Sequence, residues 1–102
     1  MTRSGTLPVL RRGNGMHEEH TAAALRRALR HAQAGARDAA HDIVQDLPGP
    51  AAAWLHAHLH REEGALANAA YWYRRAQRPV FDGPLAAELA RIVAALTDPE
   101  AP

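Results

Sequence analysis

The sequence contains no cysteine and only one serine, Ser4. The absence of cysteine excludes disulfides and thiolate metal sites, so any metal site must be built from histidine or oxygen ligands. It also excludes a thiol nucleophile, and Ser4 lies in the first few residues, away from any folded core. A hydrolytic enzyme of this sequence would therefore need a metal-activated water, with Glu63 or a histidine as the base.

Long apolar runs and an excess of charge are also missing. No stretch approaches the roughly 20 apolar residues that span a bilayer, and the net charge is only +1. These features predict a soluble, cytoplasmic protein that binds neither membranes nor nucleic acid. Lysine is absent too, and every basic residue is an arginine. Arginine suits the recognition of carboxylate or phosphate, but codon usage in a GC-rich genome gives the same bias, and we favour that explanation.

What the chain does contain is alanine. The chain has 102 residues, 47% of them hydrophobic, and about half of these are alanines. Alanine favours helices and lets them approach closely, but each one buries little area. We therefore expect one domain with a thin, tightly packed core, for which homodimerisation would be a natural supplement.

The apolar residues recur with helical spacing from Met16 onward, and no segment alternates as a strand does. We expect a disordered arm at residues 1–15, a helical domain at 16–98 and a flexible tail at 99–102. The predicted helices start near Met16, Arg37, Ala51, Leu66 and Pro84, and the first four end near Gly35, Leu47, Glu63 and Arg78.

A weak internal sequence repeat predicts how these helices pair. A shift of 29 residues places Gly35 on Gly64 and aligns the first two helices with the next two. The second hairpin also resembles a tetratricopeptide unit, although His56 stands where that family has leucine. The positions that carry this resemblance are Gly64, Ala69, Tyr73 and Ala76. We predict an all-α fold of about five helices, built as antiparallel, degenerate tetratricopeptide-like hairpins with a C-terminal capping helix.

The stretch WLHAHLHREEG, residues 54–64, concentrates the candidate chemistry. At about 100° per residue, His56, His60 and Glu63 share one helix face, while His58 points to the other side. Two histidines at i and i+4 with a carboxylate one turn on can bind zinc, iron or nickel. The same spacing also arises by chance in a chain with seven histidines.

Neighbouring helices offer further groups for this face. His41 and Gln45 of the second helix are candidates for a third ligand or a hydrogen-bond partner, and Asn68 of the fourth helix could reach the same place. Three interpretations stay open: a metal site formed by His41, His56, His60 and Glu63, a hydrogen-bonded cluster that orders the helices, and a small-molecule or catalytic pocket.

The segment NAAYWYRRAQRPVF, residues 68–81, holds most of the aromatic residues. Trp72, Tyr73 and Phe81 are more typical of a core than of a binding site. Arg74 and Arg75 are expected to form surface ion pairs with acidic neighbours, or to bind an anion if they are buried.

Together, AHDIVQD, WLHAHLHREEG and NAAYWYRRAQRPV resemble a family of small helical proteins of bacteria and fungi to which no reaction is assigned. The resemblance covers about Gly35 to Val80 and departs at Ala65, where that family usually has aspartate. It implies a ligand site that includes His41, Gln45, His56, His60, Arg61, Glu63, Asn68, Tyr71, Trp72 and Arg75.

Two functional hypotheses are consistent with these features. The first is a helical binding protein whose histidine, glutamate and asparagine cluster binds a divalent metal or a small anionic ligand. It predicts that His56, His60 and Glu63 converge with His41. The alternative is a tetratricopeptide-like protein interaction module in which the histidines are purely structural.

Overall fold

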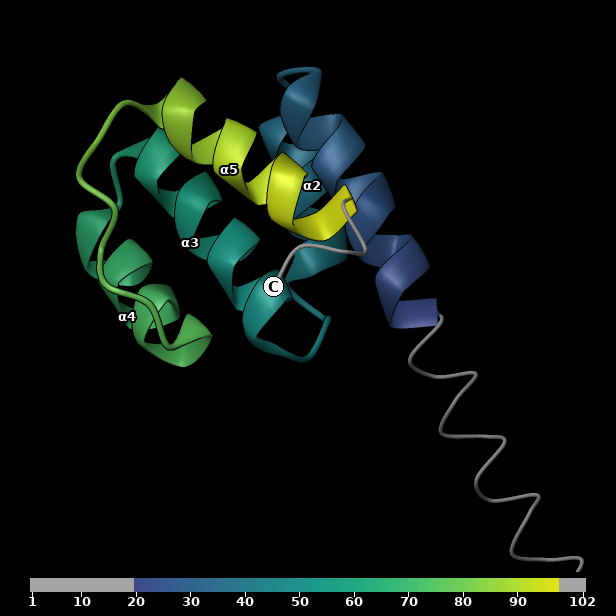
Figure 1. Ribbon diagram of the computed structural model, residues 1–102, viewed down its shortest axis with the longest axis horizontal. Coiled ribbons are helices and arrows are strands. Elements are labelled where there is room, and N and C mark those ends of the chain that lie inside the picture. Colours follow the sequence, from purple (N-terminus) through teal and green to yellow (C-terminus); the bar gives the residue numbers. More distant parts are fainter. Residues whose placement is uncertain (1–19, 98–102) are drawn as a thin grey trace, which may run out of the picture.

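The computed structural model describes residues 20–97, which form five helices and no strand (Figure 1). The first helix is described over residues 20–33. The others are α2 (Arg37–Val44), α3 (Pro50–Glu63), α4 (Leu66–Ala76) and α5 (Leu85–Thr97). The first helix packs with α2 and α3 packs with α4, which confirms the all-α, five-helix prediction. The predicted arm at 1–15, the helix start at Met16 and the tail at 99–102 lie outside the described residues.

The two predicted hairpin turns have matching geometry. Gly35 and Gly64 both adopt a left-handed conformation, with φ of 81° and 80°. The residue after each glycine donates its backbone N–H to a histidine carbonyl, from Ala36 to His31 and from Ala65 to His60, both at 2.9 Å. This is the glycine-capped helix end that satisfies the last free carbonyls. The 29-residue repeat therefore corresponds to two equivalent turns.

Several helix boundaries differ from the predicted ones, among them the ends of α2 and α4 and the start of α5. α2 ends at Val44 rather than near Leu47, and Pro48 disfavours helical dihedrals in Leu47. α4 ends at Ala76 rather than Arg78, because Gln77 takes a left-handed conformation with φ of 61°. α5 begins at Leu85, and Pro84 precedes it as the residue whose carbonyl accepts the first helical hydrogen bonds.

α3 is the central element of the fold. It packs against α2, α4 and α5, and every residue from Ala52 to Leu59 is buried. In Figure 1, α5 runs alongside α3, while the segment from 77 to 84 runs along the outside of α4. A helix that is covered on several sides buries its polar residues together with its apolar ones. The histidines of α3 are therefore placed in contact with other helices.

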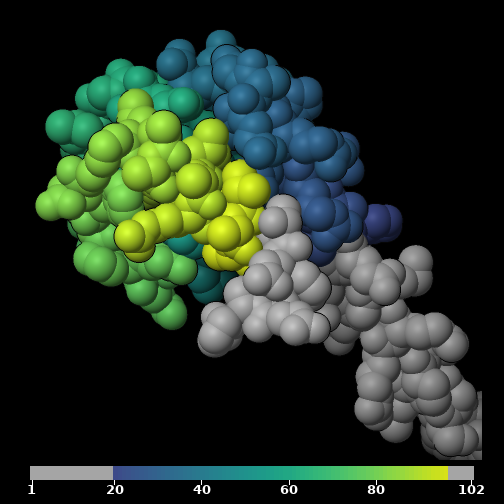
Figure 2. Space-filling model, turned by 45° about the horizontal axis from the view of Figure 1, so that its top comes forward, coloured from purple at the N-terminus to yellow at the C-terminus, as the bar shows by residue number. Residues whose placement is uncertain are grey.

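The predicted apolar stripes form the core. The core residues come mainly from the first helix and α3, with contributions from α2, α4 and α5: Leu25, Ala28, Leu29, Ala32, Ala40, Val44, Trp54, Leu55, Leu59, Ala69, Tyr73 and Ile92. Figure 2 shows α5 (yellow) lying against the first helix (blue) on one face of the molecule. No helix among residues 20–97 is both long enough and apolar enough to cross a bilayer.

Candidate metal centre

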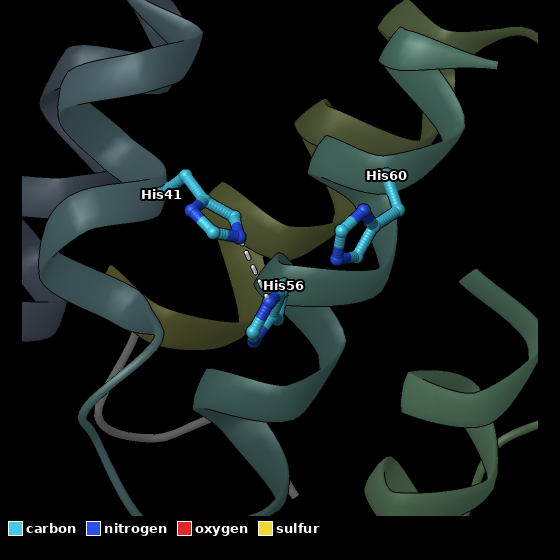
Figure 3. Close-up of side chains that lie close together, drawn as sticks. All are labelled: His41, His56 and His60. Atoms are coloured by element: carbon cyan, nitrogen blue, oxygen red, sulfur yellow. Dashed lines mark hydrogen bonds between the residues drawn. The ribbon is translucent and has the colours of Figure 1, made fainter. Parts of the chain in front are cut away.

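Three histidines from two helices meet in the space between α2 and α3 (Figure 3). His56 and His60 lie one turn apart on α3, and His41 reaches them from α2. Their positions follow from the packing: α3 is surrounded, so the side that carries His56 is buried, with 4% of that residue exposed. The predicted convergence of His41 with His56 and His60 is confirmed.

The nitrogen atoms of these rings are within reach of one another. Nε2 of His56 lies 3.1 Å from Nε2 of His41, and one ligand nitrogen from each of the three rings falls within 4.8 Å of the others. The rings of His56 and His60 are stacked with centroids 5.0 Å apart, and His41 meets both edge-on at 4.8 and 5.4 Å. We call His41, His56 and His60 the histidine triad.

Glu63, which the sequence predicts to converge with these histidines, is not part of the triad and instead forms a hydrogen bond with His60. Its Oε1 is 2.9 Å from Nδ1 of His60. A carboxylate only accepts, so Nδ1 of His60 donates, and in the neutral ring Nε2 keeps its lone pair. The contact also lowers the pKa of Glu63. Glu63 is exposed, whereas its position beside the apolar stripe predicts that it is half-buried. It is the hydrogen-bond partner that orients the ring of His60.

His56 is held neutral by its surroundings. Burial lowers its pKa to about 4, and the neighbouring His41 and His60 add to the effect. The indole of Trp72 stacks on its ring, with centroids 3.9 Å apart and planes 17° from parallel. Trp72 thus packs directly on the triad and fixes one face of the His56 ring.

The remaining predicted residues are divided between the neighbourhood of the triad and the open surface. Gln45 is exposed one turn beyond His41. Tyr71 is exposed and lies edge-on to Trp72. Arg75 lies over the ring of Trp72, 5.4 Å from its centroid. Asn68 is also exposed, and within residues 20–97 its side chain forms no hydrogen bond with the triad.

The expected surface ion pairs of Arg74 and Arg75 do not form among residues 20–97. Both guanidinium groups instead lie over the ring of Tyr71, at 5.9 and 5.8 Å. Arg75 also donates a long hydrogen bond of 3.4 Å to the Tyr71 hydroxyl.

The opposite side of α3 carries a second polar cluster, around the buried carboxylate of Glu88 on α5. Its Oε1 accepts from Nδ1 of His58 and from Arg61, each at 2.8 Å. Its Oε2 accepts from the Trp54 indole at 3.1 Å and from the Tyr73 hydroxyl. Arg61 also donates to the carbonyl of Gly83 at 2.7 Å. Arg61 therefore faces away from the triad, and its side chain ties α3 to α5.

These donors keep Glu88 ionised. Burial alone raises the pKa of its carboxyl, but the four hydrogen bonds outweigh burial and bring the pKa to about 2. Burial and the adjacent carboxylate raise the pKa of Tyr73. Burial lowers the pKa of Arg61, but the contact with Glu88 outweighs it and the pKa is raised. The charges of Glu88 and Arg61 therefore neutralise each other inside the fold.

The sequence does contain a signal for this cluster. Glu88 lies three residues after Leu85 and four before Ile92, inside the otherwise apolar stripe of the last helix. A carboxylate at such a position must be buried with partners. His58 faces the same side, as the helical geometry predicts, but only the packing of α5 onto α3 brings the two together.

The triad has the donor set of a divalent metal site. Tetrahedral zinc with nitrogen ligands at about 2 Å places those nitrogens about 3.3 Å apart. The pair His41 and His56 already meets this distance, and the widest separation, 4.8 Å, exceeds it by roughly 1.5 Å. Three histidines leave a fourth position for water or a ligand, which is the arrangement that polarises or activates bound groups.

Comparison of the chain with protein-family models, with curated proteins and with solved structures gave no match. The function must therefore be argued from the site alone.

Proposed function

We propose that this protein binds one divalent transition metal ion, zinc, iron or nickel, through His41, His56 and His60. The observation that carries the proposal is the meeting of three imidazole rings whose ligand nitrogens lie within 4.8 Å. Imidazole is a preferred ligand of these metals, and calcium or magnesium would require oxygen ligands instead.

The surroundings of the triad support this proposal in two ways. Metal-bound histidines usually donate their second ring N–H to a carboxylate or carbonyl, which sets the tautomer and the ring orientation. Glu63 stands in that relation to His60, at 2.9 Å. Burial of His56 favours its neutral form, and a neutral ring is the one that offers a lone pair to a metal.

The test uses tag-free protein, titrated with zinc by calorimetry and with cobalt by absorption spectroscopy. We expect one ion per chain and the visible bands of a four-coordinate cobalt site. His41→Ala and His60→Ala should weaken binding by more than the roughly 10–100-fold cost of losing an outer hydrogen-bond partner. Both residues are only half-buried, so the variants should keep the helical fold.

His31→Ala is the matched control. His31 is exposed and occupies the position before the first turn that His60 occupies before the second. Its removal should leave the stoichiometry and affinity unchanged. A wild-type protein that binds no zinc, or binds it as weakly as the His41→Ala, His60→Ala double variant, would show that the triad is a structural polar cluster.

Protein interaction is a second candidate, favoured by one observation. A shallow apolar groove of about 470 Å³ runs along α5 beside Gln33 and is lined by Ala86, Leu89, Ala90, Val93 and Ala94. A second copy of this chain is the occupant to test, because a small domain with an alanine-rich core gains from burying more apolar surface. Ala90→Asp should convert a dimer to a monomer in sedimentation velocity, and a wild-type monomer would exclude this candidate.

A further inference from the structure

A polar cleft lies one helical turn along from the histidine triad. It has a volume of about 400 Å³ and is formed where α2 ends, α3 begins and α4 ends. Gln45 on its wall lies four residues after His41, and Ala53 lies three before His56. Trp72 lines the cleft and also stacks on the ring of His56. The cleft and the triad therefore share a wall.

The cleft contains a cation that forms no ion pair with any carboxylate of residues 20–97. Arg75 lines it, and its only hydrogen bond to a residue between 20 and 97 is the 3.4 Å contact with the Tyr71 hydroxyl. Its guanidinium is held over the rings of Tyr71 and Trp72, at 5.8 and 5.4 Å from their centroids. Stacking restricts a guanidinium without using its N–H groups, which remain free to bind a carboxylate or phosphate with two parallel hydrogen bonds.

The other polar groups of the cleft decide between these two anions. Asp46 also lines it, so its walls carry one charge of each sign. Like charges placed in one site repel, and this carboxylate disfavours a dianion such as phosphate more than a singly charged group. The amides of Gln45 and Gln77 add neutral donors and acceptors. Gln77 is moreover a non-glycine residue with a left-handed backbone, a strained conformation that often occurs at binding sites.

We propose that this cleft binds a small carboxylate ligand, which Arg75 anchors in the space that shares Trp72 with the triad. The placement next to a metal rests on the proposed function, whereas the recognition of the carboxylate by Arg75 does not. The ligand class is a singly charged organic acid, because the walls carry one charge of each sign.

The probes are acetate and inorganic phosphate, each added to the full chain with and without zinc and followed by proton–nitrogen NMR. We expect acetate to move the indole N–H of Trp72 and the side-chain amides of Gln45 and Gln77 in a saturable way at millimolar concentration. Phosphate should bind more weakly. Arg75→Gln should weaken acetate binding about tenfold or more, since it removes a charge-assisted pair of hydrogen bonds.

Arg74→Gln is the matched control. Arg74 neighbours Arg75, lies over the same tyrosine ring and does not line the cleft, so its loss should leave acetate binding unchanged. Three results would each overturn the proposal: no saturable shift with acetate, an equal loss in both arginine variants, or phosphate binding at least as tight as acetate. Zinc stoichiometry measured on the same samples separates a failure of the cleft from a failure of the triad.

Discussion

Glu88 is a buried carboxylate that joins α5 to α3 and α4. It accepts hydrogen bonds from four side chains on two other helices while it is 0% exposed. Glu88→Gln replaces an ionised carboxylate by a neutral amide. The NH2 group of the amide is a donor, and it must face side chains that also donate. The substitution also leaves the charge of Arg61 unpaired. We expect the free energy of unfolding to fall by about 3 kcal/mol, measured by urea denaturation followed by circular dichroism.

The control for this change is Glu62→Gln. Glu62 is 26% exposed at its side chain and lies 3.9 Å from Nε2 of His58, beyond hydrogen-bond distance. Its neutralisation should cost less than about 1 kcal/mol. Equal effects of the two substitutions would mean that the hydrogen bonds of Glu88 do not stabilise the fold.

At the same scale, Glu63 is expected to tune the affinity of the triad for metal. Without Glu63, the Nδ1 of His60 loses the acceptor that fixes its ring and tautomer. Glu63→Ala should weaken zinc binding by roughly tenfold while the stoichiometry stays at one ion per chain. Calorimetry measures this, with Glu62→Ala as the neighbour that makes no contact with His60. Unchanged affinity in the Glu63→Ala protein would mean that this carboxylate does not orient His60 for metal binding.

Individual residues also show how far the sequence could predict the site. The helical repeat predicts that His56 and His60 share a face, and a short connection places His41 beside them, so the triad follows from local geometry. The partners of Arg61 could not be found in this way. They depend on how α5 is rotated against α3, which is set by the sum of the core contacts and by no local pattern.

At the scale of the element, α3 and α4 end in the same way. The residues that directly follow α3 and α4 are Gly64 and Gln77, and both lie in the left-handed region, with φ of 80° and 61°. A side chain costs roughly 1–2 kcal/mol in that conformation, so Gln77→Gly should stabilise the protein by about 1 kcal/mol. Gly64→Ala should destabilise it by a similar amount, and no atom lies within 4 Å of the added carbon to change the balance.

Thermal unfolding of the two variants checks the prediction, since opposite shifts of a few degrees are expected. A loss of stability in Gln77→Gly would mean that the glutamine side chain makes compensating contacts in the cleft. The helix boundaries show the same physics: the periodicity continues to Arg78, but the chain leaves the helix at the left-handed Gln77, and Pro79 disfavours helical dihedrals in Arg78.

At the scale of the whole molecule, the fold consists of two hairpins and a fifth helix that share one central element. α3 carries the triad on the side toward α2 and the partners of Glu88 on the side toward α5. Any rotation of α3 would disturb both clusters at once. The second cluster therefore stabilises the orientation in which His56 and His60 meet His41, even though it makes no contact with a metal.

This arrangement predicts that stability falls in acid. The pKa of Glu88 is about 2 in the folded chain against an ordinary value of 4.5. A group with a lowered folded pKa contributes stability that is present above its unfolded pKa and is lost as the pH falls toward the folded one. Between pH 4.5 and 2 this amounts to on the order of 3 kcal/mol. His56, lowered from 6.5 to about 4, adds a loss in the same direction at higher pH.

Tyr73→Phe isolates the part that belongs to Glu88. The groups that face this carboxylate are His58, Arg61, Trp54 and Tyr73. Removing the Tyr73 hydroxyl removes one donor, so the pKa of Glu88 in the folded chain rises toward 4.5 and less stability remains to be lost in acid. Urea midpoints of metal-free protein, measured at several pH values from 5 to 2, should fall less steeply in the variant. Parallel curves for the two proteins would mean that acid acts elsewhere and that Glu88 does not hold α5 on α3 through its charge.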